Sequence, residues 1–168
     1  FIVFALSYSF QKLLFSINKE EIEAQMEEYY QAGEYDKLDV YMEENYVESK
    51  DYYTYTQVTL MMYDYNQYMS HRMAFDALPI EEKLVDDYQL KYALDHSLQV
   101  YQRDCGIYKE YDENNAELHE RLKKEIMAYW VGELLLTEEE IEKLISADYV
   151  SHSELSELVE NIKERRYK

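Results

Sequence analysis

Cysteine, proline and glycine are scarce in this sequence. Among its 168 residues there are one Cys, one Pro and three Gly. The turns of many-stranded sandwiches and barrels draw on Gly and Pro, so the scarcity of both excludes those folds. A single Cys likewise excludes a disulfide scaffold and a Cys-rich zinc site. The length and composition predict one domain that is mostly helical.

Positive charge is also in short supply. Seventeen Lys and Arg face 36 Asp and Glu, which gives a formal net charge of −19. Such an excess argues against direct binding to nucleic acid phosphates or to an anionic membrane surface. Hydrophobic residues at 47% and aromatic residues at 15%, including twenty Tyr, argue against disorder in spite of the charge.

Local motifs for catalysis, metals and cofactors are missing from the sequence. No His-Glu-x-x-His or Glu-x-x-His pair, calcium loop, glycine-rich phosphate loop or Gly-x-Ser-x-Gly elbow occurs. Cys105 has no His after it at a helical spacing that could activate its thiol. Neighbouring acidic pairs such as Asp86 and Asp87 indicate a solvated face. The sequence therefore predicts a protein that is not an enzyme and needs no cofactor or metal.

Residues 1–17 form the only strongly hydrophobic segment, with Lys12 as its one charge. As a helix it would span about 26 Å, slightly less than the ~30 Å core of a bilayer. It fits a truncated membrane anchor, the remnant of a signal segment, or a core or docking helix with Ser9, Lys12 and Ser16 as its polar stripe. The density of Phe and the absence of a starting Met favour the anchor. Residues 19–50 carry eleven acidic and three basic side chains, which favours an extracytoplasmic position for the rest of the chain.

Residues 18–168 are predicted to form a single acidic, Tyr-rich helical domain. The fold class expected is all-α, an irregular array of antiparallel hairpins with about six to seven helices. Hydrophobic spacing and punctuation predict helices over residues 18–32, 35–46, 52–78, 80–104, 116–136 and 137–146, and a last one from Ser151 on.

Two kinds of local signal support these helices. Thr137 with Glu140, and Ser151 with Glu154, are capping boxes that open the last two helices. Spacings of three and four residues predict the buried stripes. In the long helix the expected stripe is Tyr55, Val58, Met62, Tyr65, Met69 and Met73, and in the next it is Leu90, Leu94, Leu98 and Tyr101.

Residues 29–42, YYQAGEYDKLDVYM, resemble the turn of a tetratricopeptide repeat. Gly33 allows the chain to reverse, and Tyr35 is expected to fill the crease between the two helices. Met26 and Leu38 depart from that family, which usually has small residues at both positions, and no second copy occurs at a spacing near 34 residues. The resemblance implies one such hairpin and, with it, scaffolding or peptide binding.

The Tyr content predicts a recognition surface on the long helix, although half-buried packing is the alternative explanation. Tyr rings offer large, rigid contact area. Beside so many carboxylates they favour a cationic, partly apolar peptide held in part by cation–π contacts. The candidate partner-binding residues are Tyr52, Tyr53, Tyr55, Tyr63, Tyr65 and Tyr68.

The function predicted is that of a non-enzymatic protein-interaction domain, the extracytoplasmic part of a membrane-anchored protein. A hydrophobic segment that leads into an acidic, Tyr-rich helical domain resembles membrane-anchored proteins of Gram-positive bacteria. The alternative is a soluble cytosolic acidic protein that mimics nucleic acid and inhibits a nucleic-acid-binding target. Mixed charge signs in every segment after residue 18 weigh against the alternative.

Overall fold

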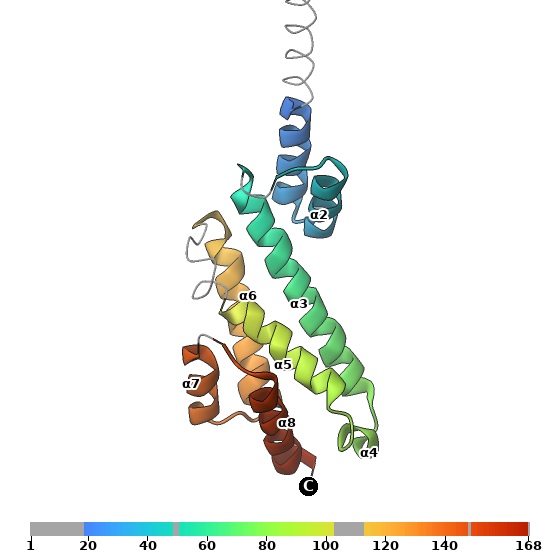
Figure 1. The fold of residues 1–168 in the computed structure, drawn as a ribbon, viewed down its shortest axis with the longest axis vertical. Helices are drawn as coiled ribbons and strands as arrows, with labels where there is room; N and C mark the ends of the chain where they lie inside the picture. Colours follow the sequence, from blue (N-terminus) through green and yellow to red (C-terminus); the bar gives the residue numbers. More distant parts are fainter. Residues whose placement is uncertain (1–18, 49–50, 103–112, 148, 168) are drawn as a thin grey trace, which may run out of the picture. The chain divides into compact units, whose positions relative to one another are not determined.

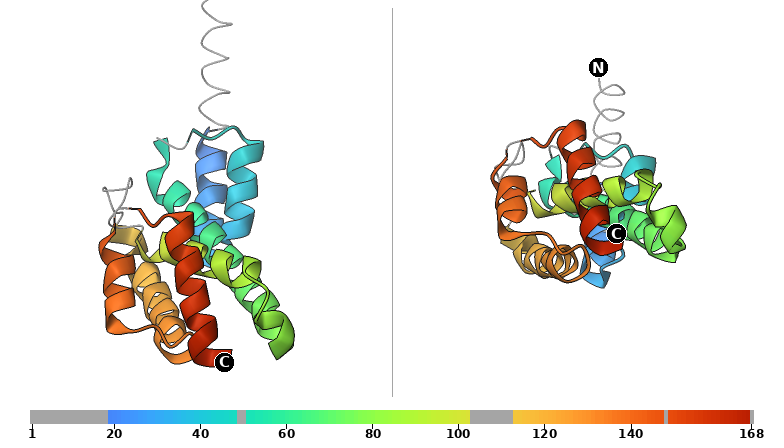
Figure 2. Two further views of the ribbon diagram at one scale, coloured as in Figure 1. Left: turned by 60° about the horizontal axis from the view of Figure 1, so that its bottom comes forward. Right: turned by 90° about the horizontal axis from the view of Figure 1, so that it is seen from below.

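The computed structural model describes residues 19–48, 51–102, 113–147 and 149–167. In these ranges the chain is all-α, with eight α-helices, seven of them at least seven residues long, and no strand. Neighbouring helices pack antiparallel (Figure 1, Figure 2). The predicted fold class is confirmed at this level. The hydrophobic segment over residues 1–17 and Cys105 lie outside the described residues.

The chain divides into two compact units, Phe1–Thr59 and Leu60–Lys168. A first helix covers residues 19–32. The later α-helices are α2 (Tyr35–Glu44), α3 (Tyr53–Ala77), α4 (Ile80–Lys83), α5 (Tyr88–Tyr101), α6 (Ala116–Ala128), α7 (Glu138–Ser146) and α8 (His152–Tyr167). A short 3-10 helix (Glu113–Asn115) precedes α6, and a π-helical turn (Tyr129–Glu133) continues directly from its end.

The first hairpin turns at Gly33, as predicted. This residue has a φ of +69°, in the left-handed region that favours glycine. Two backbone hydrogen bonds close the helix end, from Glu34 N to Tyr29 O at 2.9 Å and from Gly33 N to Tyr30 O at 3.1 Å. This pair of bonds is the Schellman motif, which satisfies carbonyls that a helix otherwise leaves without donors.

The second helix, α2, ends at Glu44, two residues earlier than predicted. Its end uses the same pair of bonds, from Val47 N to Met42 O at 3.0 Å and from Tyr46 N to Glu43 O at 3.1 Å. Tyr46 therefore takes the left-handed position, with φ +53°, although it is not a glycine. Its side chain is 92% exposed.

The two helices of this hairpin pack through large side chains. Met26 and Leu38, the positions that depart from the tetratricopeptide pattern, are both fully buried. Tyr41 packs back against the first helix, where its ring meets Tyr29 edge to face at 5.7 Å. Tyr35 is half-buried, with its ring 6.2 Å from that of Tyr30.

In the second unit, α5 packs against α6, α7 and α8. The predicted stripe on α5 is confirmed for Leu90, Leu94 and Leu98, which are at most 3% exposed, whereas its fourth member, Tyr101, is only half-buried. Trp130 is fully buried, and its indole N–H donates to Ser97 Oγ at 3.0 Å. A buried indole with a partner for its N–H stabilises a core without leaving a polar group unsatisfied.

Two helices are shorter in the structure than their sequence pattern predicts. The prediction of one continuous helix over 80–104 was wrong, because the chain leaves the helical conformation between α4 and α5. There the carboxylate of Asp86 accepts a hydrogen bond from the backbone N–H of Gln89 at 3.2 Å, which starts a new helix. The helix expected over 116–136 ends at Ala128, where the π-helical turn begins.

The buried stripe of α3 also differs from the prediction. Within the second unit its buried hydrophobic residues are Met61, Tyr68 and Phe75, whereas Met73 is 65% exposed. Arg72 shares this inward face and places its guanidinium 4.3 Å from the centroid of the Tyr129 ring. Because Arg is not counted as hydrophobic, the spacing of hydrophobic residues alone does not reveal that Arg72 belongs to the buried face of α3.

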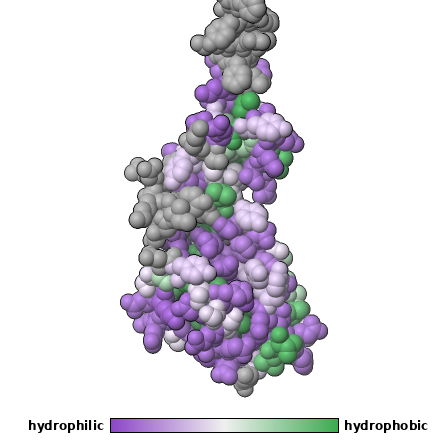
Figure 3. Space-filling model, in the orientation of Figure 1, coloured by the Kyte–Doolittle hydropathy of each residue, from purple (hydrophilic) through white to green (hydrophobic). Residues whose placement is uncertain are grey.

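The described surface is mostly hydrophilic in the view of Figure 3. An apolar patch lies near α4, where Ile80 is 60% and Val85 79% exposed. Exposed apolar groups on this scale are common on folded proteins.

Candidate functional site

The tyrosines of the predicted recognition surface are divided between the two units. In the first unit, the hydroxyl of Tyr52 donates to Glu23 at 2.8 Å and that of Tyr55 donates to Glu27 at 2.6 Å. Their rings are nearly parallel, with centroids 6.3 Å apart. The hydroxyl of Tyr53 accepts a hydrogen bond from the side chain of Gln57. These groups tie the first unit together internally.

The same hydrogen bonds shift the acid–base behaviour of the first unit. Partial burial, and then the bond to Glu23, raise the pKa of Tyr52 to about 12. Burial and the bond to Glu27 raise the pKa of Tyr55 in the same way. In return, the hydrogen bond from Tyr55 lowers the pKa of Glu27. Each pair is therefore strongest while the phenol is neutral and the carboxylate is ionised.

In the second unit the three remaining candidates lie in different environments. Tyr68 is fully buried and accepts a hydrogen bond from Arg72 at 3.1 Å. Tyr65 donates to Glu125 at 2.6 Å. Tyr63 is 56% exposed and meets the ring of His96 at 6.5 Å.

A histidine pair joins α3 to α5. His71 Nδ1 lies 2.7 Å from Gln89 Oε1, and His96 Nδ1 lies 3.1 Å from Asp64 Oδ1. Both partners are oxygen acceptors, so each Nδ1 is the donor. The two imidazole planes are only 4° apart, with centroids 5.9 Å apart. Each helix thus supplies one His and one oxygen acceptor, a reciprocal pair of bonds that fixes how these helices face each other.

Within the described ranges, no group of three or more His, Cys, Asp and Glu side chains is arranged to hold a metal ion. In the same ranges, no helix combines the length and apolar character needed to cross a membrane.

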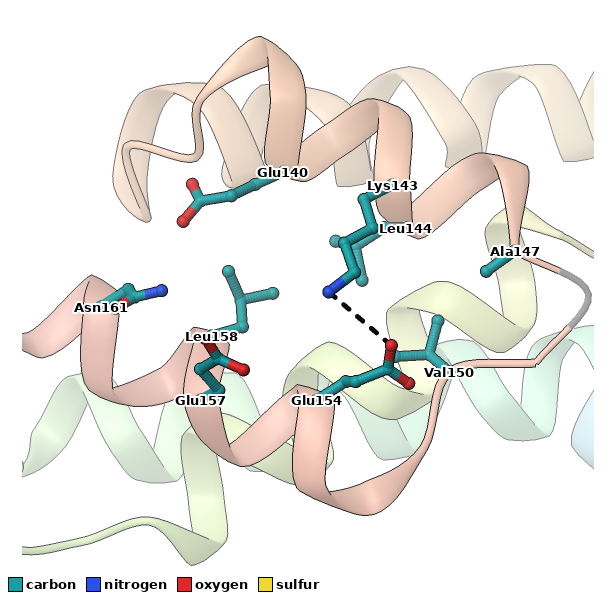
Figure 4. A pocket seen from close by; sticks show the side chains of 9 residues that line it. All are labelled: Glu140, Lys143, Leu144, Ala147, Val150, Glu154, Glu157, Leu158 and Asn161. Atoms are coloured by element: carbon teal, nitrogen blue, oxygen red, sulfur yellow. Dashed lines mark ion pairs between the residues drawn. The ribbon is translucent and has the colours of Figure 1, made fainter.

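The second unit contains a hollow between α7 and α8, of about 80 Å³, called here the α7–α8 hollow (Figure 4). Both helices contribute residues spaced i, i+3, i+4, i+7. The lining residues are Glu140, Lys143, Leu144 and Ala147 of α7 and its end, Val150 of the connection, and Glu154, Glu157, Leu158 and Asn161 of α8. One stripe from each helix therefore builds the site.

The two predicted capping boxes fix two carboxylates at the rim of this hollow. Thr137 N donates to Glu140 Oε2 at 2.9 Å, and Glu140 N donates back to Thr137 Oγ1 at 3.2 Å. Ser151 N and Oγ donate to Glu154 Oε2 at 2.9 and 2.7 Å. Since each box fixes its Glu side chain against the start of its own helix, both carboxylates are oriented before any ligand arrives.

The floor of the hollow is apolar. Leu144 and Leu158 are 5% and 7% exposed, and Ala147 and Val150 complete the apolar lining. Figure 4 shows Leu158 between the two helices, with carboxylates and Lys143 around it. A side chain with an apolar stem and a polar head matches this combination of floor and rim.

Two cations of the chain reach the rim, in different ways. Arg165 Nη1 donates a hydrogen bond to Glu140 Oε1 at 3.0 Å and forms an ion pair with Oε2 at 2.9 Å. Lys143 Nζ lies 3.6 Å from Glu154 Oε1, a longer contact between partly exposed groups. Among the described residues, Glu157 makes no ion pair or hydrogen bond through its carboxylate. With Glu140, Glu154 and Glu157 against Lys143, the lining is net acidic.

The rim carboxylates are held ionised. Partial burial alone would raise the pKa of Glu140, but hydrogen bonds from Arg165 and Thr137 outweigh it and lower the pKa. The hydroxyl and then the backbone N–H of Ser151 lower the pKa of Glu154, with a smaller contribution from Lys143. Glu140 and Glu154 therefore stay negatively charged at pH values below the usual pKa of a glutamate. This negative charge favours a cationic ligand.

The comparisons with known proteins supply no template for this site: no family model, no curated protein and no solved structure matches the chain.

Sequence reasoning found the two capping boxes but missed the hollow. The available signal was a short repeat, because Thr137–Ala147 and Ser151–Asn161 both have a hydroxyl residue, a Glu three positions on and a Leu seven positions on. Two adjacent helices of the same pattern bring equivalent stripes together when they pack antiparallel.

Proposed function

We propose that this chain is a non-enzymatic helical interaction domain that binds a cationic, partly apolar segment of a partner protein at the α7–α8 hollow. The observation that carries the proposal is an apolar floor, Leu144 and Leu158, beneath the oriented carboxylates of Glu140 and Glu154. The absence of any local catalytic motif in the sequence supports the non-enzymatic part.

An Arg or Lys side chain fits this arrangement chemically. Its methylene stem covers apolar surface while its charged head stays at the polar edge. At the hollow the stem would lie on Leu144, Leu158 and Val150, and the head would meet Glu154 and Glu157. Arg is the better match of the two, because its planar guanidinium bonds carboxylates through two parallel hydrogen bonds.

The charge of the whole chain supports a cationic partner as well. A net charge of −19 attracts positive segments over distances beyond direct contact and raises their rate of encounter. Salt screens that attraction, so the affinity is expected to fall as ionic strength rises.

The first hairpin supports the same class of function. Its glycine turn and the contact of Tyr41 with Tyr29 are features that we propose make it tetratricopeptide-like, within an irregular array of hairpins. We also propose that residues 1–17 tether the domain to a membrane, with the domain on the extracytoplasmic side. Their hydrophobic sequence supports this proposal.

The test is binding of a short probe peptide, acetyl-Gly-Leu-Arg-Leu-Gly-amide, to the full chain. Methyl NMR signals of Leu144, Val150 and Leu158 report on the hollow directly. We expect these signals to move with the Arg peptide and much less with the same peptide carrying citrulline, a neutral analogue of similar shape. Equal shifts with both peptides, or no shift with either, would contradict the proposal.

Matched variants separate a local site from general acidity. Glu157→Gln removes a lining carboxylate, whereas Glu117→Gln removes an exposed carboxylate of α6 outside the hollow. We expect Glu157→Gln to weaken binding of the Arg peptide about two- to fivefold, as for an exposed ion pair, and Glu117→Gln to change it little. Equal weakening by both variants would instead favour an acidic surface of the nucleic-acid-mimic kind.

A further inference from the structure

We infer that Lys143 is an internal competitor for the α7–α8 hollow, which a cationic partner must displace before it binds fully. The inference rests on the proposed function and concerns how the same site is regulated. It predicts that Lys143 lowers the affinity of the hollow for the partner. Removal of the Lys143 ammonium should therefore raise that affinity.

The position of Lys143 is that of a ligand. The side chain leaves α7 over the hollow and points its Nζ at Glu154 on α8, 3.6 Å from Oε1 (Figure 4). The Oε2 atom of Glu154 already accepts hydrogen bonds from Ser151 N and Oγ, so Oε1 is the oxygen of Glu154 that remains for a cation. The Oε1 atom is therefore the acceptor for which Lys143 and an arriving cation compete.

The contact is weak enough to be displaced. The side chains of Lys143 and Glu154 are 66% and 41% exposed, so water screens their attraction. Ion pairs of this kind contribute little to stability. A partner whose stem also covers the apolar floor, Leu144 and Leu158, gains apolar burial in addition to the ion pair.

Arg165 shows what a structural cation at this rim looks like. Its Nη1 lies within 3.0 Å of both oxygens of Glu140 and donates a hydrogen bond to Oε1, and its side chain is 31% exposed. Glu140 is also the more enclosed carboxylate, at 19% exposed. The α8 residue equivalent to Lys143 in the short repeat is Glu157, so the hollow holds one loosely paired cation and not two.

Two variants with the same change in net charge test the inference. Lys143→Met keeps an unbranched apolar stem and removes the ammonium. Lys124→Met makes the same change at an exposed position of α6 that does not line the hollow. We expect Lys143→Met to bind the Arg probe peptide about two- to fivefold more tightly than the unmodified chain, and Lys124→Met to match the unmodified chain within experimental error. The same methyl NMR titration gives both dissociation constants.

A second readout tracks Lys143 itself. In the unmodified chain, the NMR signals of its ε-methylene should move as the Arg peptide binds, because the ammonium loses its contact with Glu154. Signals that stay in place at saturation would overturn the inference.

The outcomes distinguish the inference from the function on which it rests. If the unmodified chain prefers the Arg peptide to the citrulline peptide but Lys143→Met binds no more tightly than Lys124→Met, the competitor role is wrong and the proposed function stands. If neither the unmodified chain nor Lys143→Met prefers the Arg peptide, both fail. Circular dichroism of each variant checks that the helices are intact, as expected for a side chain that is 66% exposed.

Discussion

In the unit that ends at Thr59, tyrosine hydroxyls donate to glutamates, as Tyr52 does to Glu23 and Tyr55 to Glu27. In the unit from Leu60 on, helices enclose aliphatic side chains and the fully buried Trp130. The second unit also has such a pair, Tyr65 with Glu125, so the units differ in degree: among the described residues the first unit buries only Met26, Leu38, Met42 and Val58 as its apolar core, and the second buries the rest. A composition rich in Tyr and Glu can therefore support two kinds of helix packing in one chain.

The largest effect should come from Trp130→Ala. The loss of a fully buried indole removes contacts and leaves a cavity, which costs about 3–5 kcal/mol of unfolding free energy. Hydrogen exchange should show the loss of protection in α5 and α6, with little change over residues 19–44. Trp130→Phe, which keeps a ring, is the control and should cost less. Equal loss of protection in both units after Trp130→Ala would mean that they unfold together.

The next effect concerns the buried Lys163, whose ammonium pairs with Asp87 and Glu160. Its side chain is only 1% exposed, whereas that of Asp87 is 60% exposed. Asp87→Asn leaves a buried cation with one carboxylate fewer and should cost about 1–3 kcal/mol, below the cost for a fully buried pair. Lys163→Met should cost less, because water can solvate the exposed carboxylate that remains.

Urea denaturation of both variants measures this asymmetry. A larger loss for Lys163→Met than for Asp87→Asn would contradict this order. Because Met keeps an unbranched apolar stem, such a loss would show that the ammonium, through its pairs with both Asp87 and Glu160, contributes more than the remaining carboxylates gain from water.

A smaller and opposite pair of effects is expected at the two left-handed positions of the first unit. Gly33→Ala forces a Cβ into positive φ and should cost about 1 kcal/mol, although nothing lies within 4 Å of the added atom. Tyr46→Gly removes strain at φ +53° and should stabilise the same unit by up to about 1 kcal/mol. Hydrogen exchange of residues 19–44 measures both. A loss of protection in Tyr46→Gly would show that its exposed ring makes a stabilising contact.

The smallest effect should be that of Tyr55→Phe, which removes the donor to Glu27 and costs about 0.5–1 kcal/mol at neutral pH. The folded-state pKa of Glu27 is lowered from 4.5, so its contribution is present above pH 4.5 and is lost as pH falls through the folded value. Acid unfolding of the first unit should therefore depend less on this carboxylate in the variant. Tyr46→Phe, at an exposed hydroxyl, is the matched control.

At alkaline pH the stability of the first unit should change in the opposite direction, falling as pH rises. The pKa of Tyr52 is raised from 10 to about 12, so its contribution is present below pH 10 and is lost as pH rises towards 12. Tyr52→Phe should flatten this part of the pH profile of the first unit. A profile that is unchanged between pH 10 and 12 would show that the bond to Glu23 does not form in solution.

Where a signal is local, the sequence was a good guide to the fold. Gly33, the capping boxes at Thr137 and Ser151, and the leucine stripe of α5 each determine structure through neighbours within one or two helical turns. The break before α5 was missed because Asp86 was assigned to a helix surface. An Asp near a helix start can bond the backbone instead, and this competes with helix continuation.

Where a feature depends on contacts between helices, the sequence was a poor guide. The stripe of α3 was misplaced because Arg72 is turned inward by the Tyr129 ring, a residue 57 positions away. Three tyrosines of the predicted surface, Tyr52, Tyr55 and Tyr65, donate to carboxylates on other helices, which no spacing rule reveals. The α7–α8 hollow was missed for the same reason, although its oriented carboxylates belong to capping boxes that were predicted.

Trp130 is the only tryptophan of the chain, and it lies in the second unit. Its indole is shielded from water and bonded to Ser97, and the ring of Tyr101, 5.2 Å away, can pass excitation energy to it. Tryptophan absorbs at wavelengths where tyrosine does not, so its fluorescence reports on the second unit alone. Tyrosine emission arises from both units. The protein therefore carries an optical label, without any modification, that distinguishes the unfolding of one unit from that of the other.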